Sequence, residues 1–156
     1  MEGFVFIQLE EALLIYGGKS NSSTEPSRIF LFDLSKNEWS FHETKGDIPP
    51  NISYPAYWYD PPKYVFIHGG KVGNKSSDET YLLDLETYTW RKIFSVQHPT
   101  SRYGHCAVVR HEEKQAYIFG GAIILKDKEK YHDNINRFEF SNKHYFINHY
   151  YFYRIH

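Results

Sequence analysis

One feature recurs along this sequence: an apolar run that ends in two adjacent glycines, about every 51 residues. The pairs are Gly17-Gly18, Gly69-Gly70 and Gly120-Gly121, which close the runs LLIYGG, YVFIHGG and AYIFGG. Each run predicts a short buried strand, followed by a place where the backbone needs residues without a Cβ. Repetition at this period predicts stacked supersecondary units, and it constrains the architecture more than any single side chain does.

Two further markers repeat with the glycines, an acidic residue and an aromatic residue six positions later. The pairs are Asp33 with Trp39, Asp84 with Trp90, and Glu139 with Tyr145. The step between acidic markers is 51 residues and then 55, whereas the last step between glycine pairs is 51. A four-residue insertion between Gly121 and Glu139 accounts for the difference.

Each repeat divides into four short apolar runs separated by turn residues, and none has a helical period long enough to compete. We expect strands near 4–9, 12–18, 28–34 and 38–43, then 53–59, 63–68, 80–85 and 89–94, then 104–110, 115–121, 136–140 and 145–147. The third run is apolar at consecutive positions in the first two repeats, which predicts sheets covered on both faces. Four-stranded sheets of this kind at this period are typical of a β-propeller.

The connections after the first and third strands of each repeat are short, whereas those after the second and fourth strands are long. In an antiparallel meander, alternate connections leave opposite ends of the sheet, so the long ones share one end, which is the candidate binding surface. The candidate partner-binding residues on these connections are Ser20, Asn21, Arg28, Asn74, Lys75, Lys126, Lys128 and Lys130. A solvated loop without a binding role remains the alternative for each of them.

The three markers in this order resemble the Kelch repeat family, which has a double glycine, a late acidic residue and then an aromatic, usually Trp. Pro99, Arg102, Gly104 and His105 also resemble the family's first-strand signature. The resemblance implies a Kelch-type propeller with three four-stranded antiparallel blades, at about 4–44, 53–94 and 103–147, together spanning 1–147. It also implies a non-catalytic adaptor or scaffold that binds a protein partner. Asp33 and Asp84 are expected to accept hydrogen bonds from turn amides.

Three blades do not close a ring, because propellers typically have about 4 to 8. The alternatives are a homodimer that completes the ring, further blades of a longer propeller, or a truncated product without independent function. The aromatic tail at 148–156 is not expected to belong to a blade. We expect the longer stretch at 141–156 to derive from translated non-coding sequence, with an interfacial membrane anchor as the alternative.

Composition excludes several classes of partner. The net charge of -1, without a basic run, argues against nucleic acid binding. The single cysteine, Cys106, cannot form an intramolecular disulfide. The first residues lack the basic start of a signal peptide, and no apolar run approaches the length of a membrane helix. We therefore expect a cytoplasmic protein.

Catalytic and metal-binding patterns are weak in this chain. His98, His105 and His111 lack the spacing of a zinc site, and His105 is better explained as a structural position of the repeat. Some Kelch-like propellers resemble radical copper oxidases, in which a Tyr is crosslinked to a Cys, so such an enzyme is the alternative. Cys106 would be the thiol, but a small buried core residue is the simpler expectation. We expect no cofactor.

Overall fold

The structure is a computed structural model that describes residues 2–19, 28–94, 99–126, 128–140 and 152–154, the last three by their backbone alone. All regular structure in these residues is β-strand, which confirms the all-β prediction. The same residues form no helix that is long and apolar enough to cross a membrane.

Blade 1 is a four-stranded antiparallel meander, as expected. Its strands are β1 (Val5–Gln8), β2 (Ala12–Tyr16), β3 (Arg28–Asp33) and β4 (Glu38–Glu43), hydrogen-bonded in chain order. Short polar turns join β1 to β2 and β3 to β4, so the sequence can reverse direction without long-range contacts.

Blade 2 has the same meander and one additional strand. Its strands are β6 (Ala56–Asp60), β7 (Tyr64–His68), β10 (Thr80–Asp84) and β11 (Thr89–Ile93). The connection from blade 1 adds β5 (Lys45–Gly46), which pairs in parallel with β11. The strand β5 was not predicted from the sequence, because two residues are too few to show a strand pattern.

Blade 3 consists of β12 (Cys106–Arg110), β13 (Gln115–Phe119), β16 (Asn134–Glu139) and β17 (Phe152–Arg154). Its fourth strand differs from the prediction. The strand expected near 145–147 lies outside the described residues, whereas 152–154, expected to stand apart from the blades, pair antiparallel with β16. The physical reason is that the open edge of β16 offers backbone N–H and C=O groups, which a later extended segment can pair whatever its side chains.

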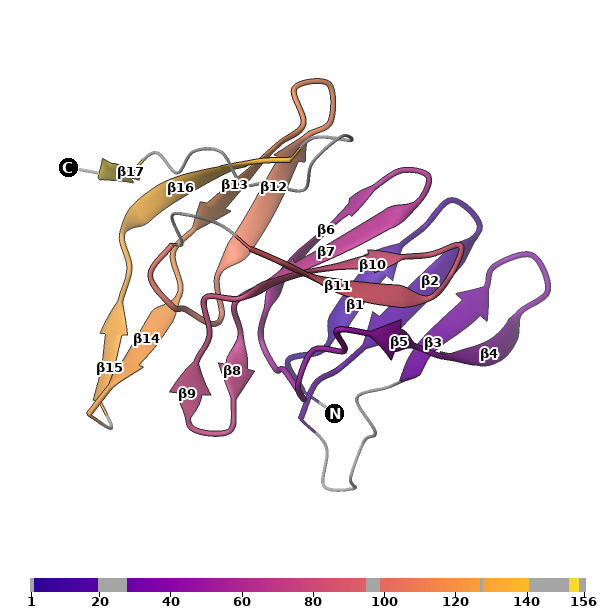
Figure 1. The fold of residues 1–156 in the computed structure, drawn as a ribbon, viewed down its shortest axis with the longest axis horizontal. Coiled ribbons are helices and arrows are strands. Elements are labelled where there is room, and N and C mark those ends of the chain that lie inside the picture. The colour runs from indigo at the N-terminus through magenta and orange to yellow at the C-terminus, as the bar shows by residue number, and fades with distance from the viewer. Residues whose placement is uncertain (1, 20–27, 95–98, 127, 141–151, 155–156) are drawn as a thin grey trace.

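Two hairpins occupy connections that the sequence suggested were loops. They are β8 (Lys71–Val72) with β9 (Lys75–Ser76), and β14 (Ala122–Leu125) with β15 (Lys128–Tyr131). Both hairpins project from the same end of the molecule, which is at the bottom of Figure 1. The amide of Ile124 donates to Ser76 Oγ at 3.4 Å, which links the two hairpins. This end is called the long-loop end below.

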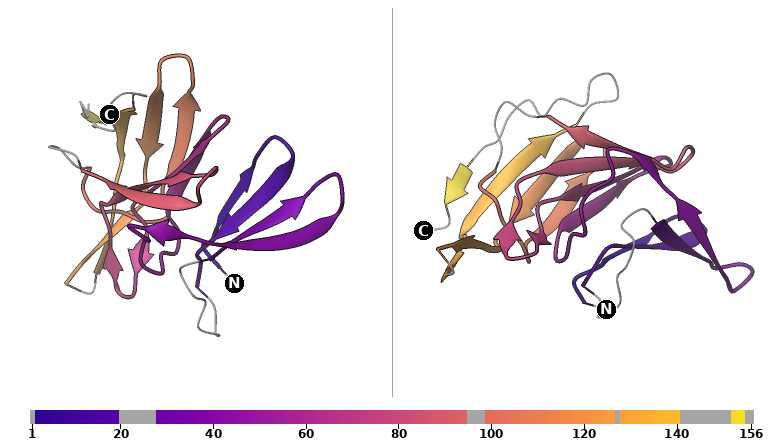
Figure 2. Two further views of the ribbon diagram at one scale, coloured as in Figure 1. Left: turned by 45° about the vertical axis from the view of Figure 1, so that its right-hand side comes forward. Right: turned by 60° about the horizontal axis from the view of Figure 1, so that its bottom comes forward.

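The three sheets fan out side by side, with blade 2 between the other two (Figure 2). One core cluster joins blades 1 and 2, and a second joins blades 2 and 3. Blade 2 is therefore covered on both faces, and every residue of β10 is buried. Blade 1 differs from the prediction of two covered faces, because the described residues cover only one of them. Trp90 of blade 2 is 1% exposed, whereas its counterpart Trp39 is 61% exposed.

The first two glycine pairs lie where one blade contacts the beginning of the next. Gly18 N donates to Ile52 O at 2.9 Å, and Gly70 N donates to Arg102 O at 2.8 Å. A Cβ on Gly70 would lie 2.4 Å from Ile52 Cγ2, so a side chain has no room there. Gly70 also has a φ of +99°, a conformation that other residues rarely adopt. The repeat of the glycines is therefore a repeat of contacts between blades.

Candidate functional site

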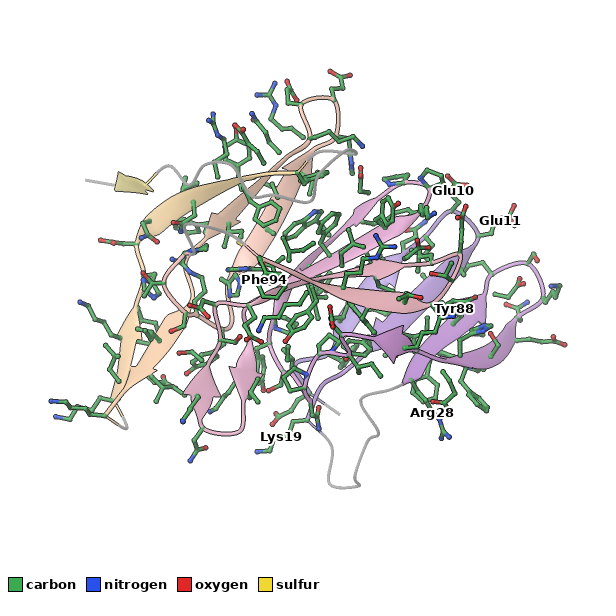
Figure 3. The ribbon with its side chains drawn as sticks, viewed as in Figure 1. Glu10, Glu11, Lys19, Arg28, Tyr88 and Phe94 are labelled. Atoms are coloured by element: carbon green, nitrogen blue, oxygen red, sulfur yellow. The ribbon has the colours of Figure 1, made fainter. Side chains whose placement is uncertain are left out.

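The long-loop end holds a groove of about 510 Å³ between blades 1 and 2. Its lining residues are Glu2, Lys19, Asn51, Ser53, Tyr54, Lys71, Val72, Gly73 and Asn74. Figure 3 shows Lys19 at this end, whereas Glu10 and Glu11 lie at the opposite end, where the short turns are. Most of the lining side chains carry a hydroxyl, amide or ammonium group, so the groove presents hydrogen-bond donors.

A repeated backbone pairing holds the groove in place. Each blade begins with one antiparallel bridge to the residue just after its own glycine pair, which joins Glu2 to Lys19 and Ser53 to Lys71. Between blades, Tyr54 N donates to Gly3 O at 2.6 Å. Tyr54 has a φ of 56°, which is uncommon for a residue with a side chain. The lining residues of the groove are thus fixed by main-chain contacts and not by loop packing alone.

Aromatic and charged side chains continue the groove wall toward blade 3. The Lys71 ammonium lies 5.4 Å from the centre of the Tyr103 ring. The Tyr103 hydroxyl donates to Glu129 on β15, and this bond, together with partial burial, raises the pKa of Tyr103 to about 12. At the other wall, partial burial and a hydrogen bond to Glu2 raise the pKa of Tyr54. Both tyrosines therefore stay protonated at neutral pH and act as donors.

A second hollow of about 450 Å³ lies beside the β14–β15 hairpin. It is lined by Thr100, Ile123, Leu125, Lys130, Tyr131, His132 and Asp133. Burial and the neighbouring Arg102 charge lower the pKa of His132, so this imidazole is neutral near pH 7. Leu125 and Tyr131 are exposed at the rim of this hollow and give it an apolar edge.

The eight binding residues predicted from the sequence do not lie together in one site. Asn74 lines the groove and Lys130 lines the second hollow. Lys75, Lys126 and Lys128 are exposed on the two hairpins, whereas Ser20 and Asn21 lie outside the described residues.

Arg28 is exposed at the start of β3, away from the groove. It pairs with Glu43, and its guanidinium lies 5.3 Å from the centre of the Phe41 ring.

Of the residues that line the groove, only Asn74 was predicted from the sequence, and the residues that were missed include Lys19, Tyr54 and Lys71. A signal for the lysines was present, because each directly follows a glycine pair. Tyr54 carried no such signal, because its position at the groove depends on a positive φ and on contacts with blade 1.

Arg102, a repeat marker, is fully buried at the junction of blades 2 and 3. Its Nη1 donates to Gly120 O at 3.0 Å and to Asn134 Oδ1 at 3.2 Å, and its Nε donates to Thr100 O at 3.1 Å. A guanidinium can make these bonds together because its donors form a fixed planar fork. Arg102 therefore positions the strands behind the second hollow.

His105 is the second buried marker at this junction. Its ring meets the ring of His68 edge to face, with 5.4 Å between centres. Burial, and then the charge of Arg102, lower the pKa of His105 to about 3. The side chain is therefore a neutral packing element at physiological pH.

Cys106 differs from the sequence expectation, because it is exposed and not buried. It lies on the face of β12 that is turned away from blade 2, opposite Phe119. The reason is the alternation of β12, which directs Ala107 and Val109 to the core instead.

No group of three or more His, Cys, Asp or Glu side chains is placed to hold a metal ion in the part of the chain that the structure describes. His98, one of the three histidines considered from the sequence, lies outside that part.

Comparison with known proteins places this architecture in a family. A family model described as the KLHDC2/KLHL20/DRC7 Kelch-repeats domain matches residues 3–148. The chain belongs to the Kelch-repeat family. The resemblance inferred from the glycine, acidic and aromatic markers is thereby confirmed, and the family indicates a protein-interaction module.

Several curated proteins are similar to this chain. Acyl-CoA-binding domain-containing protein 5 of Arabidopsis thaliana is 33% identical over 121 residues, which cover 76% of this chain and 18% of that protein. Host cell factor 2 of Homo sapiens is 23% identical over 137 residues, covering 85% and 16%. Dynein regulatory complex subunit 7 of Chlamydomonas reinhardtii is 30% identical over 128 residues, covering 79% and 10%. The chain thus spans less than a fifth of the length of these relatives.

Proposed function

We propose that this chain is a non-catalytic adaptor or scaffold module that binds a segment of a partner protein in the groove between blades 1 and 2. The observation that carries the proposal is the groove itself, about 510 Å³ in volume and bounded by main-chain bridges of two blades. A concave site held by rigid elements can bind an extended segment at a low entropic cost.

The chemistry of the lining favours a peptide with acidic side chains. Lys19 and Lys71 supply positive charge, and Asn51 and Asn74 supply amides that can donate to peptide carbonyls. Glu2 is the one carboxylate among the lining residues, and its hydrogen bond to Tyr54 engages it. An acidic segment would therefore meet two ammonium groups and little repulsion.

The test is a selection of random peptides displayed on phage against the whole chain, followed by affinity measurements on variants. Selected peptides should be enriched in Asp and Glu. Lys71→Glu should weaken their binding at least about tenfold, because it replaces an attraction with a repulsion. The matched control is the opposite charge reversal at the short-turn end, Glu11→Lys, which should leave affinity unchanged.

Two outcomes would count against the proposal. One is a set of selected peptides that binds Lys71→Glu as tightly as the unmodified chain. The other is a loss of binding in Glu11→Lys equal to that in Lys71→Glu. Far-UV circular dichroism of both variants checks that the blades remain folded.

A further inference from the structure

Blade 1 presents an apolar sheet face that the described residues leave open. We call it the leading face, and it consists of Phe6, Leu13, Ile15, Phe30, Phe32, Trp39 and Phe41. Phe41 is 59% exposed and Trp39 is 61% exposed, whereas the opposite face of the same sheet is buried against blade 2. Five of its seven side chains are aromatic, which is unusual for a sheet face in contact with water.

The sheet face of blade 2 that corresponds to the leading face is covered by blade 1. Counted from the glycine pair, Ile15 corresponds to Ile67 of blade 2, and counted from the acidic marker, Trp39 corresponds to Trp90. Ile67 and Trp90 both lie in the cluster that packs on blade 1. The leading face therefore repeats a surface that, one blade later, is the binding surface for a neighbouring blade.

Blade 3 presents the complementary face at the other end of the chain. We call it the trailing face, and it consists of Cys106, Val108, Tyr117, Phe119, Ile135 and Arg137. Val108 is 66% exposed and Phe119 is 41% exposed. The corresponding face of blade 1, which includes Val5, Ile7 and Leu14, is the one that covers blade 2.

Arg137 is the polar member of the trailing face. It stands where blades 1 and 2 have Leu31 and Leu82, and Glu139 Oε1 lies 3.0 Å from its Nη2. A guanidinium whose charge is balanced by a carboxylate packs well on aromatic rings, and the leading face is aromatic. The substitution of Arg for Leu is thus compatible with a contact between the two faces.

We propose that the leading face of one chain binds the trailing face of a second copy of the same chain. The contact repeats the packing between successive blades, so it is head to tail and not self-complementary. Head-to-tail contacts form closed rings when the rotation closes. Two copies supply six blades, within the range of about 4 to 8 that propellers adopt, whereas three copies exceed that range. The expected assembly is a dimer with two identical contacts.

Light scattering after size-exclusion chromatography tests the assembly. The unmodified chain should have twice the 18.6 kDa mass of one copy. Trp39→Glu on the leading face and Val108→Glu on the trailing face should each shift it to one copy, weakening association by roughly 30-fold or more through a buried unpaired charge. Tyr131→Glu is the matched control, because Tyr131 is 73% exposed but lies on the β14–β15 hairpin. It should remain dimeric.

Mixing distinguishes head-to-tail contact from pairing of like faces. Equal amounts of Trp39→Glu and Val108→Glu should recover a dimer, since one intact leading face then meets one intact trailing face. If two leading faces paired, Val108→Glu would stay dimeric alone, and if two trailing faces paired, Trp39→Glu would. Either result overturns the proposal. The proposal is also overturned if the unmodified chain is folded and has the mass of a monomer. Should Trp39→Glu misfold, Phe41→Glu replaces it on the same face.

Alkylation of Cys106 gives a second, independent measurement. Its thiol lies on the trailing face and should become less reactive toward a maleimide as the chain is concentrated. Trp39→Glu should abolish that protection, although it is at the other end of the chain. Protection that is independent of concentration would contradict the proposal.

Discussion

Gly70 shows at the scale of one residue why the glycine pairs recur. Blade 2 turns there directly against the connection from blade 1, so the missing side chain is a packing requirement as well as a conformational one. Ile52 and Ser53 occupy the space that a Cβ would need. Gly73, three residues later, has a φ of +58° but no atom within 4 Å of an added Cβ.

Substitution of these two glycines separates packing from backbone conformation. Gly70→Ala should lower the free energy of unfolding by about 3 kcal/mol, because the methyl group must displace Ile52 and the φ is unfavourable. Gly73→Ala should cost about 1 kcal/mol, from the backbone alone. Urea denaturation of both variants measures the difference. Equal losses would show that the close approach at Gly70 is not a constraint.

His105 should make stability fall on acidification. The folded chain holds it neutral, with a pKa of about 3, while the unfolded chain protonates it near 6.5. Below pH 6.5 the unfolded state therefore binds more protons, and stability should decrease by up to about 1.4 kcal/mol per pH unit. Urea denaturation at pH 7 and pH 5 measures this slope. His105→Gln should reduce the slope. An unchanged slope in His105→Gln would contradict this account.

Asp33 and Asp84 act at the scale of the element, by closing the turn after the third strand of a blade. Asp33 Oδ1 accepts from the amides of Ser35 and Lys36, both at 2.9 Å, and Asp84 Oδ1 accepts from those of Glu86 and Thr87 at 3.0 and 3.2 Å. This is the role that the sequence predicts for them. Hydrogen bonds from Ser35 and Lys36 hold the pKa of Asp33 well below its usual range.

The same substitution should cost more at Asp84 than at Asp33. Asp84 is buried, and Lys63 Nζ lies 3.3 Å from its Oδ2. Asp84→Ala therefore removes the acceptor of two turn amides and one of the two carboxylates that pair with Lys63, and it leaves a cavity at a buried position. We expect a loss of about 2 to 3 kcal/mol there, and a smaller loss for Asp33→Ala, whose turn is open to water. Thermal denaturation of the two variants measures the difference. A larger loss at Asp33 would contradict the difference in burial.

At the scale of the whole molecule, local stability should depend on where a blade lies: the central blade 2 should be more stable than blades 1 and 3. Blade 2 shares one core cluster with each neighbour, while blade 1 and blade 3 share one each. The strand β4 is mostly exposed, and β10 is entirely buried. Local opening requires little free energy where few apolar contacts are lost.

Hydrogen exchange followed by mass spectrometry should reproduce this order. In the Trp39→Glu variant, which is expected to be monomeric, amides of β10 should exchange most slowly and those of β4 at least about tenfold faster. In the unmodified chain, the proposed dimer should slow β4 but leave β10 unchanged. Equal exchange of β4 and β10 in the single-copy variant would contradict a stack stabilised at its centre.

Much of the architecture was predictable from local pattern. Glycine pairs, acidic markers and aromatic markers recur because each blade repeats the same close approach and the same turn, and both depend on residues near one another in the sequence. The lysines of the groove directly follow glycine pairs, but their place at the groove depends on the bridges of Lys19 to Glu2 and of Lys71 to Ser53, which only the structure shows. The strand β17 escaped it because an open sheet edge accepts a backbone with little regard to side chains.

The sequence by itself determined the blade, its strand order and its repeat, because these follow from hydrophobic alternation and from positions that tolerate only glycine. Only the tertiary structure decided which apolar residues are core and which are surface. Trp39 and Trp90 occupy the same position of the repeat, yet one is exposed and the other buried, because burial depends on whether a neighbouring blade is present. The glycine pairs define the blade, and the packing of its neighbours defines its free surfaces.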